Sequence, residues 1–188
     1  LRALAGRDAA GLTPGQVRSA AVESAAENLA DGLVGPLSAF AVGAQVSLAV
    51  GAAAAAWVKA VNTMDSMLGY RSKPVGWAPA RLDDLVMWLP ARAAAVLLAA
   101  AALAPGSLSA ARRWTPAVPS PNSGWPMGVL AAALAVRLEK PGGYELNPGA
   151  DLPSPTAARR GVRTVAIAGL LAYLAAALAV ALPAVIRA

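Results

Sequence analysis

Three long segments of the chain contain no charged side chain, and they alternate with polar segments rich in proline and glycine. The uncharged segments cover residues 32–58, 93–111 and 164–186. As helices rising about 1.5 Å per residue, the first would be roughly 40 Å long and the last roughly 35 Å long. Either length is enough to cross a hydrocarbon core of about 30 Å. The pattern therefore predicts membrane-spanning helices separated by polar loops.

Turn and capping residues predict where the first helices begin and end. Residues 13–16 (TPGQ) match a helix start, in which threonine caps the helix, proline occupies the first turn and glutamine bonds back to the cap. We expect this helix over about 14–30. The next apolar stretch, 33–58, is interrupted early by Gly35-Pro36.

Proline and glycine also divide the second half of the chain. We expect a loop or broken helix over about 69–79, then a helix over about 82–104 that is kinked near Pro90, because proline removes a helix hydrogen bond. A Pro- and Gly-rich connection follows at 105–126. The apolar run at 127–136 is too short to span a bilayer and predicts a re-entrant or packed helix.

A polar loop over 137–163 and a final helix over 164–186 complete the pattern. We therefore expect an all-α fold, a polytopic integral membrane bundle with broken or re-entrant helices and polar Pro/Gly-rich loops. Residues 1–188 are expected to form a single membrane domain.

Composition supports a membrane protein and excludes several kinds of chemistry. Hydrophobic residues make up 57% of the chain and charged residues 14%, whereas soluble domains are about 45–50% apolar and about 25% charged. Much of the apolarity is alanine, and small residues favour a compact bundle because they let helices approach closely in a bilayer. The absence of cysteine and histidine excludes disulfides, thiolate nucleophiles and histidine bases or ligands. Proton transfer or metal binding must use carboxylates, amides, hydroxyls, tyrosine or lysine.

The net charge of +6, from 16 Lys and Arg against 10 Asp and Glu, leaves two interpretations open. The cations either lie at lipid headgroups or bind phosphate-bearing substrates. Nucleic acid is not an expected partner, because no basic stripe or nucleic-acid motif is present. The N-terminal segment lacks both the apolar core of a signal peptide and an initiating methionine, which is typical of a fragment of a longer protein.

A first polar group lies in the second half of the first predicted helix and at its end. It consists of Glu23, Glu27, Asn28 and Asp31. The three carboxylates are spaced four residues apart and so fall along one helix face. Like charges at this spacing repel one another. The stripe is either a solvated acidic face or a site neutralised by a cation, most simply Mg²⁺, which prefers carboxylate oxygens and keeps waters for substrate phosphates.

Two further groups lie on either side of the expected 69–79 loop. Asn62, Asp65 and Ser66 share a helix face and either bind a ligand or, in the case of Asn62 and Ser66, cap the next helix. Lys59 either reaches a phosphate or snorkels from its apolar helix. In the next group, Asp83 and Asp84 point about 100° apart on a helix, so we expect them to have different roles. One would hold a metal while the other pairs with Arg81 or Arg92. Acids at a helix start are also favoured by its dipole alone.

The last group is the segment SPNSGWP at 120–126. Two prolines restrict the loop, and glycine lets backbone N–H groups approach a ligand. Each residue alone is ordinary turn chemistry, but the seven residues together are more specific.

These groups carry a resemblance to a known family. The segments ESAAENLADGLVGPL, KAVNTMDSMLGY, GWAPARLDD and SPNSGWP occur in this order and resemble the CobD/CbiB family of cobalamin biosynthesis, the adenosylcobinamide-phosphate synthases. The similarity runs from about residue 18 to 140 and more loosely through the final helix. Family members carry further apolar helices before the first motif, so the chain is expected to be the C-terminal two-thirds of a family-length protein.

The resemblance implies an integral membrane enzyme that uses ATP, with Mg²⁺, to form an amide. The amide would join the carboxylate of adenosylcobyric acid to the amine of aminopropanol or its phosphate. The residues that fall on the family motifs are Glu23, Glu27, Asn28, Asp31, Asn62, Asp65, Gly69, Tyr70, Arg81, Asp83, Asp84, Asn122, Gly124 and Trp125.

From the residue types we assign expected roles. The metal ligands, which would hold Mg²⁺ on the nucleotide phosphates, are Glu23, Glu27, Asp31 and Asp65. The substrate-binding residues are Lys59, Arg81, Tyr70, Asn122, Gly124 and Trp125. The catalytic residues are Asp83, Asp84 and Asn62, with an aspartate accepting the proton of the attacking ammonium. Trp77, Trp88 and Trp125 line the approach of the corrinoid or form an interfacial belt.

Two alternatives remain, a non-catalytic membrane protein of the AmpE-like branch of the superfamily and an ion-coupled transporter. Arg and Lys flank nearly every apolar segment, so the positive-inside rule does not orient the chain. ATP and corrinoid substrates favour a multi-pass protein of the inner cell membrane whose site faces the cytoplasm. Whether the chain forms a homo-oligomer stays open.

Overall fold

The first helical run is longer than the sequence pattern predicts. The computed structural model describes residues 11–69 and 74–187. Helix α2 (Pro14–Asn28) begins after Thr13, whose hydroxyl accepts from the Gln16 N–H while the Gln16 side chain accepts from the Thr13 N–H, which confirms the predicted capping box. The predicted end near residue 30 is wrong, because η1, a π-helix over Leu29–Val34, leads directly into α3 (Gly35–Gly43).

Pro36 accounts for the π-helical turn. Proline has no N–H to donate to the carbonyl one α-helical turn before it. In the wider π-helical turn, groups five residues apart are paired, and the Gly35 N–H donates to the Ala30 carbonyl. The helix therefore passes through Gly35-Pro36 instead of breaking there, and Asp31 lies in the widened turn.

The apolar stretch 33–58 folds into a helical hairpin, so the single long span expected there is wrong. The chain turns after α3, and α4 (Leu48–Leu68) starts at Ser47, whose hydroxyl accepts from the Val50 N–H at 3.2 Å. The two helices pack closely where Gly43 meets Gly51: a Cβ on Gly43 would lie 2.9 Å from the Gly51 Cα. Two glycines facing each other permit this reversal.

The next helical pair is bent, as predicted. Helix α5 (Pro74–Val86) and helix α6 (Trp88–Ala101) meet at 49° across Met87. Pro90 lacks the N–H that the Val86 carbonyl would accept, which places the break one turn before the proline. The loop predicted over 69–79 is too long, because α5 already begins at Pro74.

The segment between α6 and the last helix contains more structure than a polar loop. It forms α7 (Gly106–Ala111), the 3₁₀ helix η2 (Thr115–Ala117) and α8 (Gly124–Leu134), which is almost wholly buried and so is a packed helix. Strands β1 (Leu138–Lys140) and β2 (Tyr144–Leu146) then pair antiparallel, with Leu138 opposite Leu146. The predicted loop over 137–163 is therefore wrong in part. A Pro-Gly-Gly turn, with Gly142 at φ +71°, joins the two strands.

The last helix, α9 (Pro155–Arg187), starts nine residues before the predicted 164. Ser154 caps it by accepting from the Ala157 N–H at 3.1 Å. Among residues 11–69 and 74–187, Pro155–Leu182 is the one helix long and apolar enough to cross a membrane, and the bent α5–α6 pair makes a second if it counts as one span. The fold is mostly helical, with the small β hairpin as its exception.

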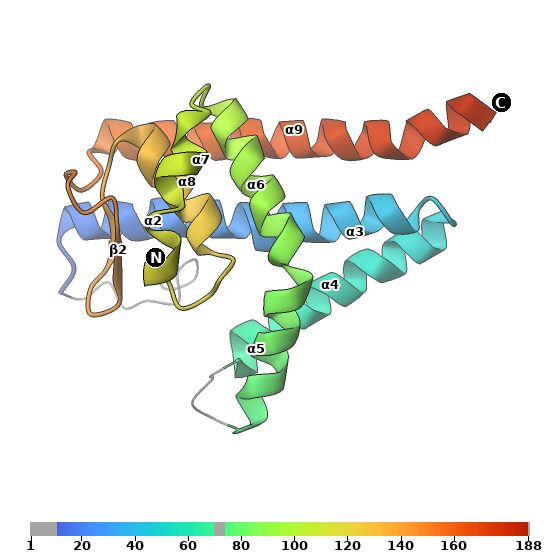
Figure 1. Ribbon diagram of the computed structural model, residues 1–188, viewed down its shortest axis with the longest axis horizontal. Coiled ribbons are helices and arrows are strands. Elements are labelled where there is room, and N and C mark those ends of the chain that lie inside the picture. The colour runs from blue at the N-terminus through green and yellow to red at the C-terminus, as the bar shows by residue number, and fades with distance from the viewer. Residues whose placement is uncertain (1–10, 70–73, 188) are drawn as a thin grey trace.

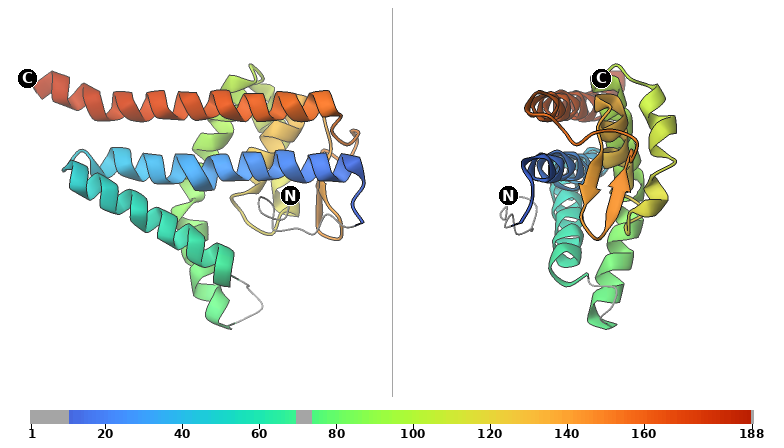
Figure 2. Two further views of the ribbon diagram at one scale, coloured as in Figure 1. Left: turned by 180° about the vertical axis from the view of Figure 1, so that it is seen from behind. Right: turned by 90° about the vertical axis from the view of Figure 1, so that its left-hand side faces the viewer.

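The elements form two layers (Figures 1 and 2). Helix α9 runs alongside the rod made by α2, η1 and α3, in the same chain direction, and α6 crosses both. The β hairpin, α7 and α8 gather near the start of α9, while the α3–α4 turn lies toward its C-terminal end. Helix α4 runs back obliquely from that turn to meet α5. The core lies where α2, η1, α6 and α8 meet, around Val22, Leu98, Met127 and Leu130.

Candidate functional site

Polar side chains from η1, α4 and α5 meet where these three elements come together. Asn62 on α4 is only 6% exposed. Its amide nitrogen lies 3.4 Å from a carboxylate oxygen of Asp83 on α5, and its amide oxygen accepts from the Lys59 ammonium at 3.2 Å. Asn62 also lies close enough to the side chain of Asp31 on η1 to stabilise its charged form. One amide thus links two carboxylates and a lysine from three elements.

More carboxylates surround this centre. Glu27 lies close enough to Asp31, and Asp65 close enough to Asp83, for their charges to interact. We call Glu27, Asp31, Lys59, Asn62, Asp65 and Asp83 the junction cluster. It unites residues that the sequence places in three separate motifs.

The electrostatics of Asp31 fit a group that exchanges protons near neutral pH. Burial, and to a lesser extent the charges of Glu27 and Asp83, raise the pKa of its carboxyl from 3.8 to about 7. The nearby Asn62 amide and the charge of Lys59 oppose this rise. A carboxyl tuned in this way can hold or release a proton at physiological pH, a property common at functional sites.

Gly69 lets α4 end beside Asp65. The Gly69 N–H donates to the Asp65 carbonyl at 2.7 Å, and a Cβ on Gly69 would collide with the Asp65 carboxylate. The collision explains why a residue without a Cβ occupies position 69. Tyr70, predicted to bind substrate, lies outside the described residues.

The two adjacent aspartates of α5 face different partners. Asp83 is buried beside Asn62, whereas Asp84 pairs with Arg81 at 4.0 Å. Arg81 also lies over the Trp77 ring, 5.9 Å from its centroid. Arg81 is thus held at the outer surface of α5.

The SPNSGWP segment supports the α5–α6 bend. Asn122 is 3% exposed; its amide nitrogen donates to the Asp84 carbonyl at 2.8 Å and its oxygen accepts from Arg92 at 3.1 Å. Arg92 also donates to the Trp88 carbonyl and lies 4.2 Å and 5.5 Å from the ring centroids of Trp88 and Trp125. Asn122 and Trp125 were both predicted to bind substrate. In the structure Asn122 contacts the backbone of α5 and Arg92, and Trp125 contacts Arg92.

Gly124, also predicted to bind substrate, has a packing role in the structure. A Cβ there would lie 3.1 Å from the Cα of Thr115, so the first turn of α8 can approach η2 closely only with glycine at this position.

Glu23 belongs to a different network. Its carboxylate oxygens accept from Ser19 at 2.8 Å and from the Tyr144 hydroxyl at 2.7 Å, and Ser19 also accepts from the Glu139 N–H. This buried network ties α2 to the β hairpin. Sequence spacing grouped Glu23 with Glu27 and Asp31 because the hairpin that supplies its partner was missed; the Pro-Gly-Gly turn was the available signal.

The predicted metal ligands are thus divided. Over residues 11–69 and 74–187, no group of three or more carboxylates is arranged to hold a metal ion by itself. The donor chemistry of the junction cluster still suits Mg²⁺, which takes oxygen ligands and is often held by one or two carboxylates together with substrate phosphates. Glu27, Asp31 and Asp65 remain the predicted ligands within it.

Comparisons with known proteins agree with the motifs. The family model described as CobD/Cbib protein matches residues 1–166. A probable cobalamin biosynthesis protein CobD of Methanothrix thermoacetophila is 42% identical over 151 residues, which are 78% of this chain and 47% of the relative. The cobalamin biosynthesis protein CobD of Rhodobacter capsulatus is 38% identical over 171 residues, 85% of this chain and 52% of the relative.

The chain spans about half the length of these curated relatives. No solved structure matches it. The family model covers most of the chain, and the sequence similarity includes all four motifs whose residues build the junction cluster and the α5–α6 bend. The chain therefore belongs to the CobD/CbiB family.

Proposed function

We propose that the chain acts in cobalamin biosynthesis as part of a corrinoid ligase. The reaction joins the free carboxylate of adenosylcobyric acid to the amine of aminopropanol or its phosphate and consumes ATP. The observation that carries the proposal is the junction cluster, which gathers residues of three family motifs around buried Asn62. The names of the relatives, cobalamin biosynthesis protein CobD, supply the pathway.

A ligase of this kind must manage charge and protons, and the cluster offers groups for both tasks. ATP supplies the phosphoryl group that activates the carboxylate. Lys59 within the cluster, and Arg81 on the outer surface of α5, are the cations that we expect to bind phosphate groups. The attacking amine arrives as an ammonium ion and has to lose a proton, which Asp83 is placed to accept beside Asn62.

Magnesium fits the same cluster as a partner of the nucleotide. Glu27, Asp31 and Asp65 would hold it, and it would lower the charge of the phosphates. The described residues lack a three-carboxylate site, so we expect phosphate oxygens and waters to complete the coordination shell. We therefore expect metal binding to depend on nucleotide.

The first test of the proposal is Asp65→Asn in the protein held in lipid nanodiscs. ADP release would be measured with adenosylcobyric acid, aminopropanol phosphate, ATP and Mg²⁺, together with the amide formed. We expect the wild-type protein to release ADP in proportion to amide, and Asp65→Asn to lose at least about 100-fold in turnover while still binding corrinoid. Asp151→Asn, an exposed aspartate on the loop before α9, serves as the matched control and should keep full activity.

Two results would contradict the proposal in different ways. Full activity of Asp65→Asn would remove its metal role. A wild-type protein that forms no amide with all substrates present would refute the ligase and favour the non-catalytic or transporter alternatives.

A further inference from the structure

The junction cluster lies directly above an apolar pocket that is built from the same elements. Gly35 follows Asp31 by four residues, Val58 precedes Asn62 by four, and Val86 follows Asp83 by three. All three of these neighbours line one pocket. Since three or four residues make about one helical turn, the pocket lies about one turn away from the cluster on each of the three elements.

This pocket has a volume of about 430 Å³ and is lined almost entirely by apolar residues. Ser38 and the Trp57 indole supply the polar side-chain atoms among its lining residues, and the Ser38 hydroxyl already donates to the Val34 carbonyl at 2.6 Å. Trp57 and Leu89 stand at its rim and are 53% and 67% exposed. The pocket therefore opens sideways between α4 and the α5–α6 bend, so a ligand larger than its volume can insert one edge.

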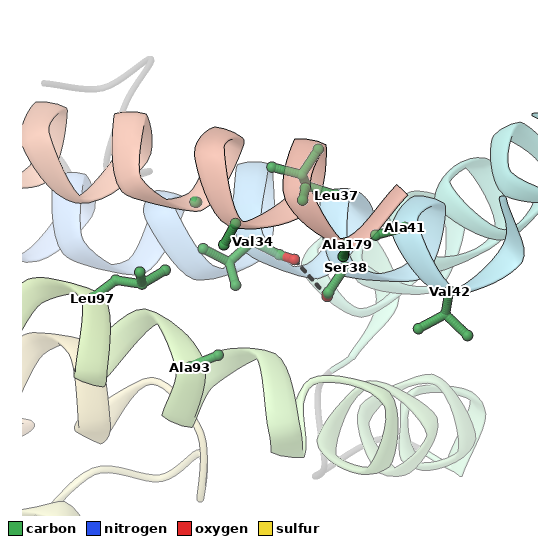
Figure 3. A pocket seen from close by; sticks show the side chains of 11 residues that line it. Val34, Leu37, Ser38, Ala41, Val42, Ala93, Leu97 and Ala179 are labelled. Carbon is green, nitrogen blue, oxygen red and sulfur yellow. Dashed lines mark hydrogen bonds between the residues drawn. The ribbon is translucent and has the colours of Figure 1, made fainter. Parts of the chain in front are cut away.

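A second apolar groove, shown in Figure 3, lacks this combination. It lies between α3, α6 and α9, has a volume of about 290 Å³, and is lined mainly by alanine, valine and leucine. The Ser38 hydroxyl points back to the Val34 carbonyl there, as the dashed line in Figure 3 shows. No charged side chain is among its lining residues, so it offers nothing that would orient a polar ligand.

We propose that the pocket below the junction cluster binds the methyl-rich edge of the corrinoid acid, with the carboxylate-bearing arm of that molecule reaching up to the cluster. The inference rests on the proposed function for the identity of the ligand. Its own support is the stacking of an open apolar pocket under a polar cluster that contains a lysine. Lys59 is the cation of the junction cluster, against the four carboxylates of Glu27, Asp31, Asp65 and Asp83, so the anionic arm would be held at the Lys59 side of the cluster. Trp57 offers the edge of the macrocycle a flat apolar surface at the rim.

Filling the pocket should weaken corrinoid binding in proportion to the added volume. Ala54 lines the pocket from α4 and is partly buried, so the series Ala54→Val, Ala54→Leu and Ala54→Phe fills it stepwise. The Kd of cobyric acid would be measured by equilibrium dialysis with protein in lipid nanodiscs, using the corrinoid's own visible absorbance. We expect the Kd to rise along the series and to reach at least about tenfold for Ala54→Phe.

The neighbouring Ala53 provides the matched control. It is exposed on the same helix and lines neither this pocket nor the groove of Figure 3, so Ala53→Phe should keep the wild-type Kd within twofold. Ala39→Phe fills the pocket from α3 instead and should repeat the loss, which guards against a folding defect special to α4. Thermal unfolding of each variant identifies any that do not fold.

The outcomes separate this inference from the ligase proposal. A wild-type protein that binds cobyric acid but forms no amide refutes the ligase, and the inference is still decided by the Ala54 series. An unchanged Kd in folded Ala54→Phe and Ala39→Phe overturns the inference even if the ligase is active. Loss of bound phospholipid from these variants without loss of corrinoid affinity also overturns it, because the pocket then holds an acyl chain.

Discussion

Asn62 shows how one residue can organise the candidate site. A side-chain amide both donates and accepts, so it can join two carboxylates to a lysine in a way that no carboxylate or hydroxyl can. Asn62 does this from a buried position, with Lys59 on one side and Asp31 and Asp83 on the other. Without it, the two carboxylates would lie in an apolar surrounding with one fewer donor, which is unfavourable.

Asp31 makes the stability of the unliganded protein depend on pH. Its pKa is about 7 in the folded chain against 3.8 for the ordinary carboxyl. Between these values the folded state holds a proton that the unfolded state releases, so stability is greatest at low pH and falls as pH rises toward and through about 7. We expect the Tm in detergent to decrease between roughly pH 4 and pH 7 and to change little above that range.

Replacing Asp31 should remove much of this decrease. Asp31→Asn carries no charge at any pH, so it should match the wild-type Tm below about pH 4 and exceed it by several degrees near pH 8. The exposed control Asp151→Asn should keep the wild-type slope. Parallel pH profiles for the wild type and Asp31→Asn would show that burial of Asp31 has no thermodynamic effect.

Sequence spacing was informative at the residue scale only within one helix. It placed Asn62 and Asp65 on a shared face and separated Asp83 from Asp84, and the structure agrees with both. The bond from Asn62 to Asp83 joins residues 21 apart in the chain, and a single sequence contains no periodic signal for such a contact. Glu23 was assigned to the wrong group for the same reason, because its partner Tyr144 is 121 residues away.

At the scale of elements, the site depends on where helices break. Proline alters a helix at two places, as the π-helical turn before Pro36 and as the bend at Met87 before Pro90, and the sequence indicated both because proline's missing N–H is a local property. The turn between α3 and α4 was missed, since it depends on a tertiary contact between Gly43 and Gly51. That turn brings Asn62 on α4 back beside Asp31 on η1, so the least predictable break is essential to the site.

The glycine contact that closes this hairpin can be tested with a single methyl group. A Cβ on Gly51 would lie 2.9 Å from the Phe40 carbonyl oxygen and 3.1 Å from the Ala44 nitrogen, and neither backbone atom can rotate away. Gly51→Ala should therefore force α3 and α4 apart and lower stability by about 1–3 kcal/mol.

The matched control is Gly106→Ala at the start of α7, where a Cβ meets nothing within 4 Å. Thermal unfolding in detergent should show a lower Tm for Gly51→Ala and an unchanged or slightly higher Tm for Gly106→Ala. If the two variants unfold together, the close approach of α3 and α4 does not stabilise the fold.

At the scale of the whole molecule, polar and apolar surfaces lie at opposite ends of the long axis. The β hairpin and the arginines at 159, 160 and 163 lie at the end where α9 starts. The α3–α4 turn and the second half of α9 lie at the other end and expose apolar residues such as Val42, Leu174 and Leu178. Gln45, a polar residue at this apolar end, donates to the carbonyls of Ala41 and Ala179, which satisfies its amide hydrogens.

This asymmetry predicts that the long axis crosses the lipid, with the junction cluster near the boundary between polar and apolar surface. The chain has no cysteine, so single cysteines can report on solvent access without a background signal. Leu174 and Val162 lie on the same helix and are 56% and 55% exposed in the protein structure, so they differ in surroundings but not in exposure. In permeabilised membrane vesicles, a water-soluble maleimide should label Val162→Cys and leave Leu174→Cys at least about tenfold slower, because thiols in hydrocarbon stay protonated and dry. Both cysteines should react equally after the vesicles are dissolved in denaturant, and equal labelling in intact lipid would mean that α9 does not lie across the membrane.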